Sequence, residues 1–144
     1  MKILVLNGPN LNLLGKRDPA IYGSETLADI ESRLQDQFPD IKFEFLQSNH
    51  EGELIDAIQN AREGSVDALI ANWGGFTHSS VAIHDALKLL EIPKVEVHLS
   101  NIHAREEFRE RSITGKAMSG IITGFGVDSY LLGVEAALKI LAKK

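Results

Sequence analysis

The sequence predicts an α/β fold in which one open parallel sheet of five strands is covered by helices on both faces. Short apolar runs of strand length alternate with longer stretches of helical periodicity along the whole chain. The chain has 144 residues, enough for one domain with a real core and too few for two, so 1–144 is expected to be a single domain. Hydrophobic residues make up 44% and charged residues 24%, as in ordinary globular proteins.

Each element of the first half follows from a local pattern. The run Ile3-Leu4-Val5-Leu6 is typical of a buried strand. Ser24 or Thr26 can cap a helix whose apolar residues recur at helical spacing, and Pro39 ends that helix. In the second strand two phenylalanines alternate with charged residues, which is typical of an edge strand with one wetter side. The helix that follows is expected to stop near Gly64.

The second half continues the alternation. After a strand that ends at Asn72, Thr77 can cap a helix that runs to Leu90 with Leu89 on its core-facing side, and Pro93 closes it. The expected strands lie at 3–6, 41–47, 67–72, 94–100 and 120–123, and the expected helices at 24–38, 51–62, 77–90, 105–109 and 127–144. Right-handed crossovers and five strands favour the flavodoxin-like order 2-1-3-4-5. In such folds the functional residues lie beyond the carboxyl ends of strands one, three and four.

Composition narrows the function classes. The net charge is -5 and there is no basic run, so nothing favours nucleic acid or an anionic membrane surface. Cysteine is absent, which excludes disulfides and thiolate chemistry. No apolar run approaches a membrane span, and Met1-Lys2 leads directly into a strand too short for a secretory signal. We therefore expect a cytoplasmic protein.

The stretch Asn7 to Gly23 is too long and too rich in Gly and Pro for an ordinary strand-to-helix connection. It carries Asn10, Arg17 and Tyr22, which supply an amide, a cation and a phenol, and its glycines can act as hinges. We interpret it as an active-site lid. A surface tyrosine on a mobile loop is the alternative.

The fourth expected strand places Glu96, His98 and Ser100 on one face, because side chains alternate along a strand. A carboxylate and an imidazole inside a central parallel strand are costly unless they are paired. The carboxylate could hold the ring tautomer and keep a proton available for acid–base chemistry. A purely structural His–Glu hydrogen bond remains the alternative.

The segment from Asn72 to Ser80 combines an amide, two glycines, hydroxyls and His78 at an expected helix start, which suits a carboxylate or another anion. An ordinary glycine turn with an N-cap is the alternative. Arg105 and Arg109 could clamp a carboxylate or could belong to a solvated charged face. No phosphate loop or dinucleotide fingerprint is present, and the histidines have no metal-ligand spacing.

Five motifs carry a resemblance to a known family: LNGPNLNLLGKRDPAIYG, QSNHEGELID, NWGGFTHSS, VEVHLSNIHAREEFR and GFGVDSYLLG. Together they resemble type II 3-dehydroquinate dehydratase, collinearly over nearly the whole chain. The resemblance implies a flavodoxin-like subunit, a homododecamer built of trimers, and no cofactor or metal. It also implies the shikimate-pathway reaction, an anti elimination of water from 3-dehydroquinate to 3-dehydroshikimate through an enolate.

The resemblance also assigns roles by motif position. Tyr22 would be the base, His98 the acid, Arg17 the lid residue that tunes Tyr22, and Asn10 the holder of a water that stabilises the enolate. The positions that bind substrate in the family are here Asn72, His78, Asp85, Leu99, Ser100 and Arg109. The family commonly has Pro, Ala and Tyr where this chain has Trp73, Gly75 and Phe76, and Arg where it has His84.

The reaction needs a base, an acid and a group that stabilises the developing oxyanion, and the residues above supply all three. Because His78 and Asp85 are expected about 10 Å apart on one helix, we predict that Asp85 reaches the site of a neighbouring subunit. Two alternatives from other classes are a flavin-binding electron carrier and a receiver-type signalling domain. A flavin-binding carrier requires a Ser/Thr-rich phosphate loop after strand one. A receiver-type domain requires acidic residues at the positions where this chain has Asn7 and Asn72.

Overall fold

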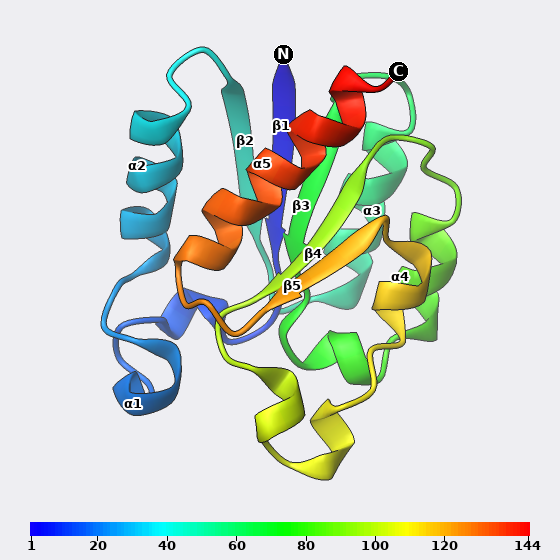
Figure 1. The fold of residues 1–144 in the computed structure, drawn as a ribbon. Helices are drawn as coiled ribbons and strands as arrows, with labels where there is room; N and C mark the ends of the chain where they lie inside the picture. The colour runs from blue at the N-terminus through cyan, green and yellow to red at the C-terminus, as the bar shows by residue number, and fades with distance from the viewer.

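A parallel sheet in the order β2-β1-β3-β4-β5 forms the centre of the computed structural model, which describes residues 1–144 (Figure 1). The predicted strand order is confirmed. The strands are β1 (Lys2–Asn7), β2 (Lys42–Gln47), β3 (Ala68–Asn72), β4 (Lys94–His98) and β5 (Gly120–Thr123). The central strands β1, β3 and β4 are almost wholly buried, whereas β2 and β5 lie at the edges and are partly exposed. This pattern follows from helices covering both faces of a parallel sheet.

Two helices pack on each face of the sheet. Helices α2 (Leu27–Gln37) and α5 (Asp128–Ala142) bury Ile30, Leu34, Tyr130, Val134 and Ala137 on one face. Helices α3 (Glu51–Ala61) and α4 (Val81–Leu87) bury Leu54, Ile58, Ile83, Ala86 and Leu87 on the other. Each fully buried large apolar side chain contributes about 1.5–3 kcal/mol, so these two cores fix the sheet that holds the functional loops.

Helix α2 begins after Thr26 rather than Ser24. The Thr26 hydroxyl accepts from the Asp29 amide at 3.2 Å, and the Asp29 carboxylate accepts from the Thr26 amide at 2.9 Å. This reciprocal capping box satisfies two backbone donors, which Ser24 could not do without an acid three residues later.

The start and end of α4 differ from the prediction. Residues Gly74–His78 form a 3₁₀ helix, and Ser80 rather than Thr77 caps α4, with its hydroxyl accepting from the Ile83 amide at 2.9 Å. The helix ends at Leu87, not Leu90, and Leu89 is exposed rather than core-facing. Several hydroxyl residues in a row offered equivalent caps, and only the packing of the loop selects one.

Lys94, at the start of β4, explains where α4 ends. Its buried ammonium donates to the carbonyl oxygens of Leu87 and Leu90 at 2.8 and 2.7 Å. The Leu87 carbonyl also accepts from the Leu90 amide at 3.0 Å, and the ammonium adds a second donor where a helix C-terminus favours a cation. Burial lowers the pKa of Lys94.

Two boundaries after β3 also differ from the prediction. Strand β4 ends at His98 instead of Ser100. Beyond this point its backbone pairs with the loop after β5, because the Gly124 and Gly126 amides donate to the carbonyls of His98 and Leu99. The helix expected at 105–109 is reduced to the 3₁₀ helix Glu107–Arg109.

The lid contains regular structure that the sequence did not predict. A 3₁₀ helix covers Leu11–Leu13, and α1 covers Pro19–Tyr22. Leu11 and Leu14 are buried in the core beneath the lid. The lid is therefore anchored at its first half, while α1 stands at the opposite end of the sheet from the two chain termini (Figure 1).

The loops after β1 and β3 touch through their backbones. The Gly8 amide donates to the Asn72 carbonyl at 2.8 Å, and a Cβ atom at Gly8 would lie 2.2 Å from the Trp73 carbonyl oxygen. Only glycine permits this approach.

No helix in the structure is long and apolar enough to cross a membrane.

Candidate active site

The loops after β1, β3 and β4 enclose a cavity of about 120 Å³ at the carboxyl edge of the sheet. A cavity this small suits a small molecule rather than a polymer. It lies at the switch point where ligands bind in open α/β sheets. Most of the residues predicted for the site line this cavity, namely Asn10, Arg17, Tyr22, Asn72, His78, His98, Leu99, Ser100 and Arg109.

Tyr22 and Arg17 meet inside the lid. The Arg17 Nη2 donates to the Tyr22 hydroxyl oxygen at 2.9 Å, and the guanidinium carbon lies 4.4 Å from the centre of the phenol ring. Helix α1 makes this contact possible, because it carries Tyr22 back over the stretch that holds Arg17. The predicted pairing of phenol and cation is present.

Arg105 is a second cation beside the phenol. Its guanidinium carbon lies 5.0 Å from the centre of the Tyr22 ring, and its Nη1 donates to the Ser100 hydroxyl at 3.3 Å. Sequence reasoning named Arg105 only as one half of a clamp with Arg109. The signal for a contact with Tyr22 was missing because the two residues are far apart in the chain.

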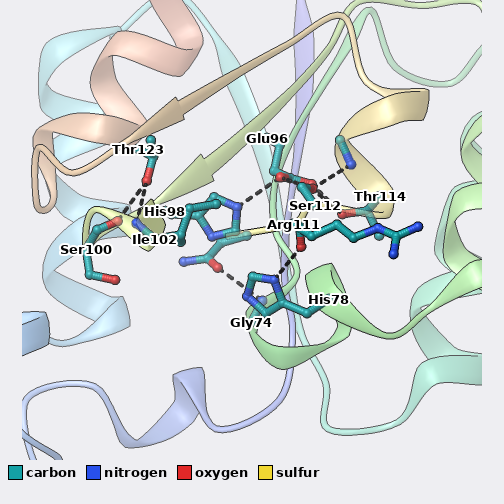
Figure 2. A network of polar contacts seen from close by, with 12 residues as sticks. Gly74, His78, Glu96, His98, Ser100, Ile102, Arg111, Ser112, Thr114 and Thr123 are labelled. Atoms are coloured by element: carbon teal, nitrogen blue, oxygen red, sulfur yellow. Dashed lines mark hydrogen bonds and ion pairs between the residues drawn. The ribbon is translucent and has the colours of Figure 1, made fainter. Parts of the chain in front are cut away.

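His98 and Glu96 form the predicted pair. The His98 Nε2 lies 2.9 Å from a Glu96 oxygen (Figure 2). Glu96 is completely buried and does not line the cavity. The hydroxyls of Ser112 and Thr114 donate to the same carboxylate. Neither residue was predicted, because both lie in a loop without any periodic pattern.

His78 faces His98 across the cavity, with the two ring centres 6.5 Å apart and the planes 24° from parallel. Its Nδ1 lies 2.8 Å from the Arg111 carbonyl oxygen and must donate to it, which leaves Nε2 as an acceptor (Figure 2). Burial lowers the pKa of His78, and the neighbouring His98 and Arg109 act in the same direction. The ring is therefore neutral at pH 7.

Asn72 is held by a buried tyrosine. Its amide nitrogen donates to the Tyr130 hydroxyl at 3.1 Å, and that hydroxyl donates to Asn7. The Asn72 oxygen accepts from the Gly74 amide at 3.2 Å. Burial raises the pKa of Tyr130, so this phenol stays neutral and serves as a donor. Of the two tyrosines in the chain, only Tyr22 reaches the cavity.

The remaining predicted residues lie around the cavity in different ways. Asn10 adopts a left-handed backbone (φ 69°), and its amide donates to Asn49 at 3.0 Å. Arg109 donates to Glu106 at 3.1 Å while it lines the cavity. The helix start expected at Thr77 and His78 lies farther along the chain, since α4 begins only after Ser80, and the binding of an anion by this segment stays a prediction.

Asp85 lies outside this cavity. Its side chain is 71% exposed on α4 and accepts from His84 at 2.9 Å. The premise that His78 and Asp85 share one helix is wrong, because His78 belongs to the preceding 3₁₀ helix. The expectation that the two side chains do not meet in one cavity agrees with the structure.

The residues that depart from the family pattern mostly face the core. Trp73 is completely buried, Phe76 packs against the same core, and only Gly75 lines the cavity. No group of three or more His, Cys, Asp or Glu side chains is placed to hold a metal ion.

Comparisons with known proteins agree with this geometry. The family described as dehydroquinase class II matches residues 1–138. A 3-dehydroquinate dehydratase of Caldicellulosiruptor bescii is 52% identical over 142 residues, covering 97% of this chain and 98% of the relative. The crystal structure of the type II dehydroquinase of Butyrivibrio crossotus superposes with a TM-score of 0.93 at 43% identity, covering 96% of this chain and 97% of that one.

A second crystal structure, of the type II dehydroquinase of Propionibacterium acnes, has a TM-score of 0.89 at 39% identity over 99% of this chain and 97% of that chain. These matches exclude the two alternative classes, a flavin-binding electron carrier and a receiver-type signalling domain. The chain belongs to the class II dehydroquinase family.

Proposed function

We propose that this protein is a 3-dehydroquinate dehydratase that removes water from 3-dehydroquinate by anti elimination and releases 3-dehydroshikimate. One observation carries the proposal: a phenol contacted by a guanidinium and an imidazole backed by a buried carboxylate line the same small cavity. A base and an acid that line one cavity suit the removal of a proton and a hydroxyl from one substrate molecule.

Tyr22 is the base of the proposed reaction. Its phenolate takes a proton from the carbon next to the substrate ketone, and the electron pair moves to the oxygen as an enolate. Arg17 donates a hydrogen bond to the same oxygen, and a cation at this distance favours the phenolate. Arg105 adds positive charge over the ring.

His98 is the acid. As the enolate collapses, the carbon–oxygen bond of the β-hydroxyl breaks, and a proton from His98 lets it leave as water. Since Nε2 faces Glu96, Nδ1 is the nitrogen left for this transfer. The negative charge of Glu96 stabilises the imidazolium before the proton is given up.

The other cavity residues bind the substrate and stabilise the enolate. Asn10 holds the water that donates to the enolate oxygen. The substrate carboxylate and hydroxyls are bound by Asn72, His78, Leu99, Ser100 and Arg109. Arg109 supplies the positive charge that a carboxylate needs, and neutral His78 offers an acceptor for a hydroxyl.

Assembly belongs to the proposal. The chain forms trimers that associate into a dodecamer, and Asp85 enters the site of a neighbouring subunit, where arginines face the cavity. Its exposure on α4 supports this role. The reaction needs no cofactor or metal, and the enzyme works in the cytoplasm in aromatic amino acid biosynthesis or quinate breakdown.

Direct conversion of the substrate tests the function. Purified protein is mixed with 3-dehydroquinate, and the absorbance of the conjugated enone in 3-dehydroshikimate is followed with time. The absorbance should rise catalytically with the wild-type protein and not with Tyr22→Phe. A wild-type protein that binds the compound without producing the enone would refute the proposal.

A further inference from the structure

The buried carboxylate of Glu96 has three donors around it. One oxygen lies 2.9 Å from the His98 Nε2 and 2.8 Å from the Ser112 hydroxyl, and the other accepts from the Thr114 hydroxyl (Figure 2). Glu96 and Thr114 have no exposed surface at all. Water therefore does not compete for these hydrogen bonds, and each missing partner would be costly.

The hydroxyl hydrogens can be assigned from their neighbours. The Ser112 oxygen accepts from the Gly115 amide at 2.8 Å, so its own hydrogen is free to point at Glu96. The Thr114 hydroxyl lies 3.5 Å from Ser112 and much closer to Glu96, so its hydrogen also points at the carboxylate. With these assignments Glu96 accepts from all three groups and donates to none of them.

An acceptor-only Glu96 decides where His98 carries its hydrogen. Nε2 must be protonated to face the carboxylate, whatever the charge of the ring. Nδ1 is then the nitrogen that gains and loses a proton, and it remains the same nitrogen through the whole reaction cycle. Because its tautomer is fixed, the His98 ring does not have to turn or exchange its hydrogen between nitrogens in each turnover.

We infer that Ser112 and Thr114 are positioning residues of the dehydration, whose hydroxyls hold Glu96 as the acceptor that fixes the tautomer and charge of His98. The inference rests on the proposed function, in which His98 is the acid. Neither residue lines the cavity, so both act through Glu96.

The backbone that carries the two hydroxyls has hydrogen bonds that do not involve the Thr114 hydroxyl. The Ile113 amide donates to the Thr77 carbonyl at 2.8 Å, and the Arg111 carbonyl accepts from His78 Nδ1 at 2.8 Å. One short segment thus sets the hydrogen positions on both facing histidines. Removing the Thr114 hydroxyl should change the partners of Glu96 and leave the path of the segment in place.

Loss of the Thr114 hydroxyl should weaken the acid. With fewer donors, a buried carboxylate becomes costly and takes up a proton more readily. A protonated Glu96 no longer stabilises an imidazolium, and neutral imidazole is a poorer proton donor. The step that breaks the carbon–oxygen bond should therefore slow, while substrate binding, which uses other groups, should change little.

The experiment uses Thr114→Val, which keeps the shape of the side chain, and Thr114→Ser, which restores a hydroxyl. Thr114→Val should lower kcat by about tenfold or more, a part of the 10²–10⁴-fold that a positioned acid supplies. KM should stay within about twofold, since uniform binding is untouched. The alkaline limb of the kcat profile should move to lower pH, and Thr114→Ser should restore most of the rate.

Thr77→Val is the matched control. Thr77 is also a completely buried threonine beside the same segment, but its hydroxyl has no partner. Its replacement should leave kcat and the pH profile as in the wild type. If Thr114→Val fails to fold, Ser112→Ala removes the other hydroxyl donor to Glu96, which comes from a half-buried side chain, and should show the same changes to a smaller extent.

A spectroscopic measurement separates this inference from the proposed function. The ¹⁵N shifts of His98 report its tautomer without any substrate, and Nε2 should be the protonated nitrogen in the wild type and less so in Thr114→Val. If the wild type converts 3-dehydroquinate but both variants keep its kcat, pH profile and His98 shifts, the inference is wrong. If the wild type lacks activity, the proposed function fails, and the shifts still decide the role of the hydroxyls.

Discussion

The Arg17 guanidinium donates to the Tyr22 oxygen at 2.9 Å and also lies 4.4 Å from the ring centre of the same residue. The two residues are separated by four positions, and α1 brings them together with Pro19 as its first residue. In the proposed reaction the lid is thus more than a cover, since it carries the proposed base and the cation beside it as one unit. The rate of the reaction should depend on both members of this pair.

Tyr22→Phe removes only the phenolic oxygen and keeps the ring that packs against the core. We expect kcat to fall by about 10²–10⁴-fold or more, the usual contribution of a positioned base. The dissociation constant for 3-dehydroquinate, measured by calorimetry, should change little. Near-normal turnover would mean that the base lies elsewhere.

Arg17→Ala removes the cation from the phenol. We expect kcat to fall, because the substitution removes the guanidinium that donates to the Tyr22 oxygen. Arg17→Lys should rescue the rate only in part, since a flexible ammonium replaces a planar fork. The neighbouring exposed cation provides the control, and Lys16→Ala should keep wild-type turnover.

Asp85→Ala tests whether a neighbouring subunit completes the site. The side chain lies outside the cavity of its own subunit, so a monomer would not need it. We expect kcat/KM to fall at least tenfold, together with a large closed oligomer for the wild type in light scattering. The control is Asp56→Ala on α3, another exposed aspartate. A fully active monomer would rule the shared site out.

The stability of the fold should fall below neutral pH because of His78. Burial lowers the pKa of His78 from its ordinary value of 6.5, so the unfolded chain takes up a proton before the folded one. As the pH falls below about 6.5, the free energy of unfolding should decrease, and this decrease stops once the folded ring is protonated as well.

Urea unfolding at about pH 7.5 and about pH 5.5 measures the free energy of unfolding above and below the pKa of an unperturbed histidine. His78→Asn removes the titrating ring and should lose less stability between the two values than the wild type does. His103→Asn, at an exposed histidine, should behave like the wild type. Equal losses in the wild type and His78→Asn would contradict the prediction.

No imine should form with the substrate ketone. No lysine lines the cavity, and Lys94 is occupied by the carbonyls at the end of α4. Borohydride added together with 3-dehydroquinate should therefore leave the protein mass and the activity unchanged. A reduced ligand adduct in the mass spectrum would require a different mechanism.

The order of the sheet and the positions of Tyr22, Arg17, Glu96 and His98 could be predicted from the sequence. Hydrophobic periodicity marks strands and helices, and parallel strands connected by helices allow few strand orders. The pairing of Glu96 with His98 follows from strand alternation alone, since residues two apart share a face. These features depend on the periodicity and spacing of residues within short segments, and both can be read directly from the sequence.

Tertiary structure alone decided the contacts between segments that are distant in the chain. Arg105 reaches Tyr22, Tyr130 holds Asn72, and Thr114 reaches Glu96 through the meeting of loops, which no periodic pattern encodes. The choice of Ser80 over Thr77 as the cap of α4 has the same origin, because neighbouring hydroxyl residues are equivalent in the sequence until the path of the loop places one of them at the start of the helix. The sequence therefore determined which chemical groups stand at the edge of the sheet, and the packing of the loops determined which of them touch.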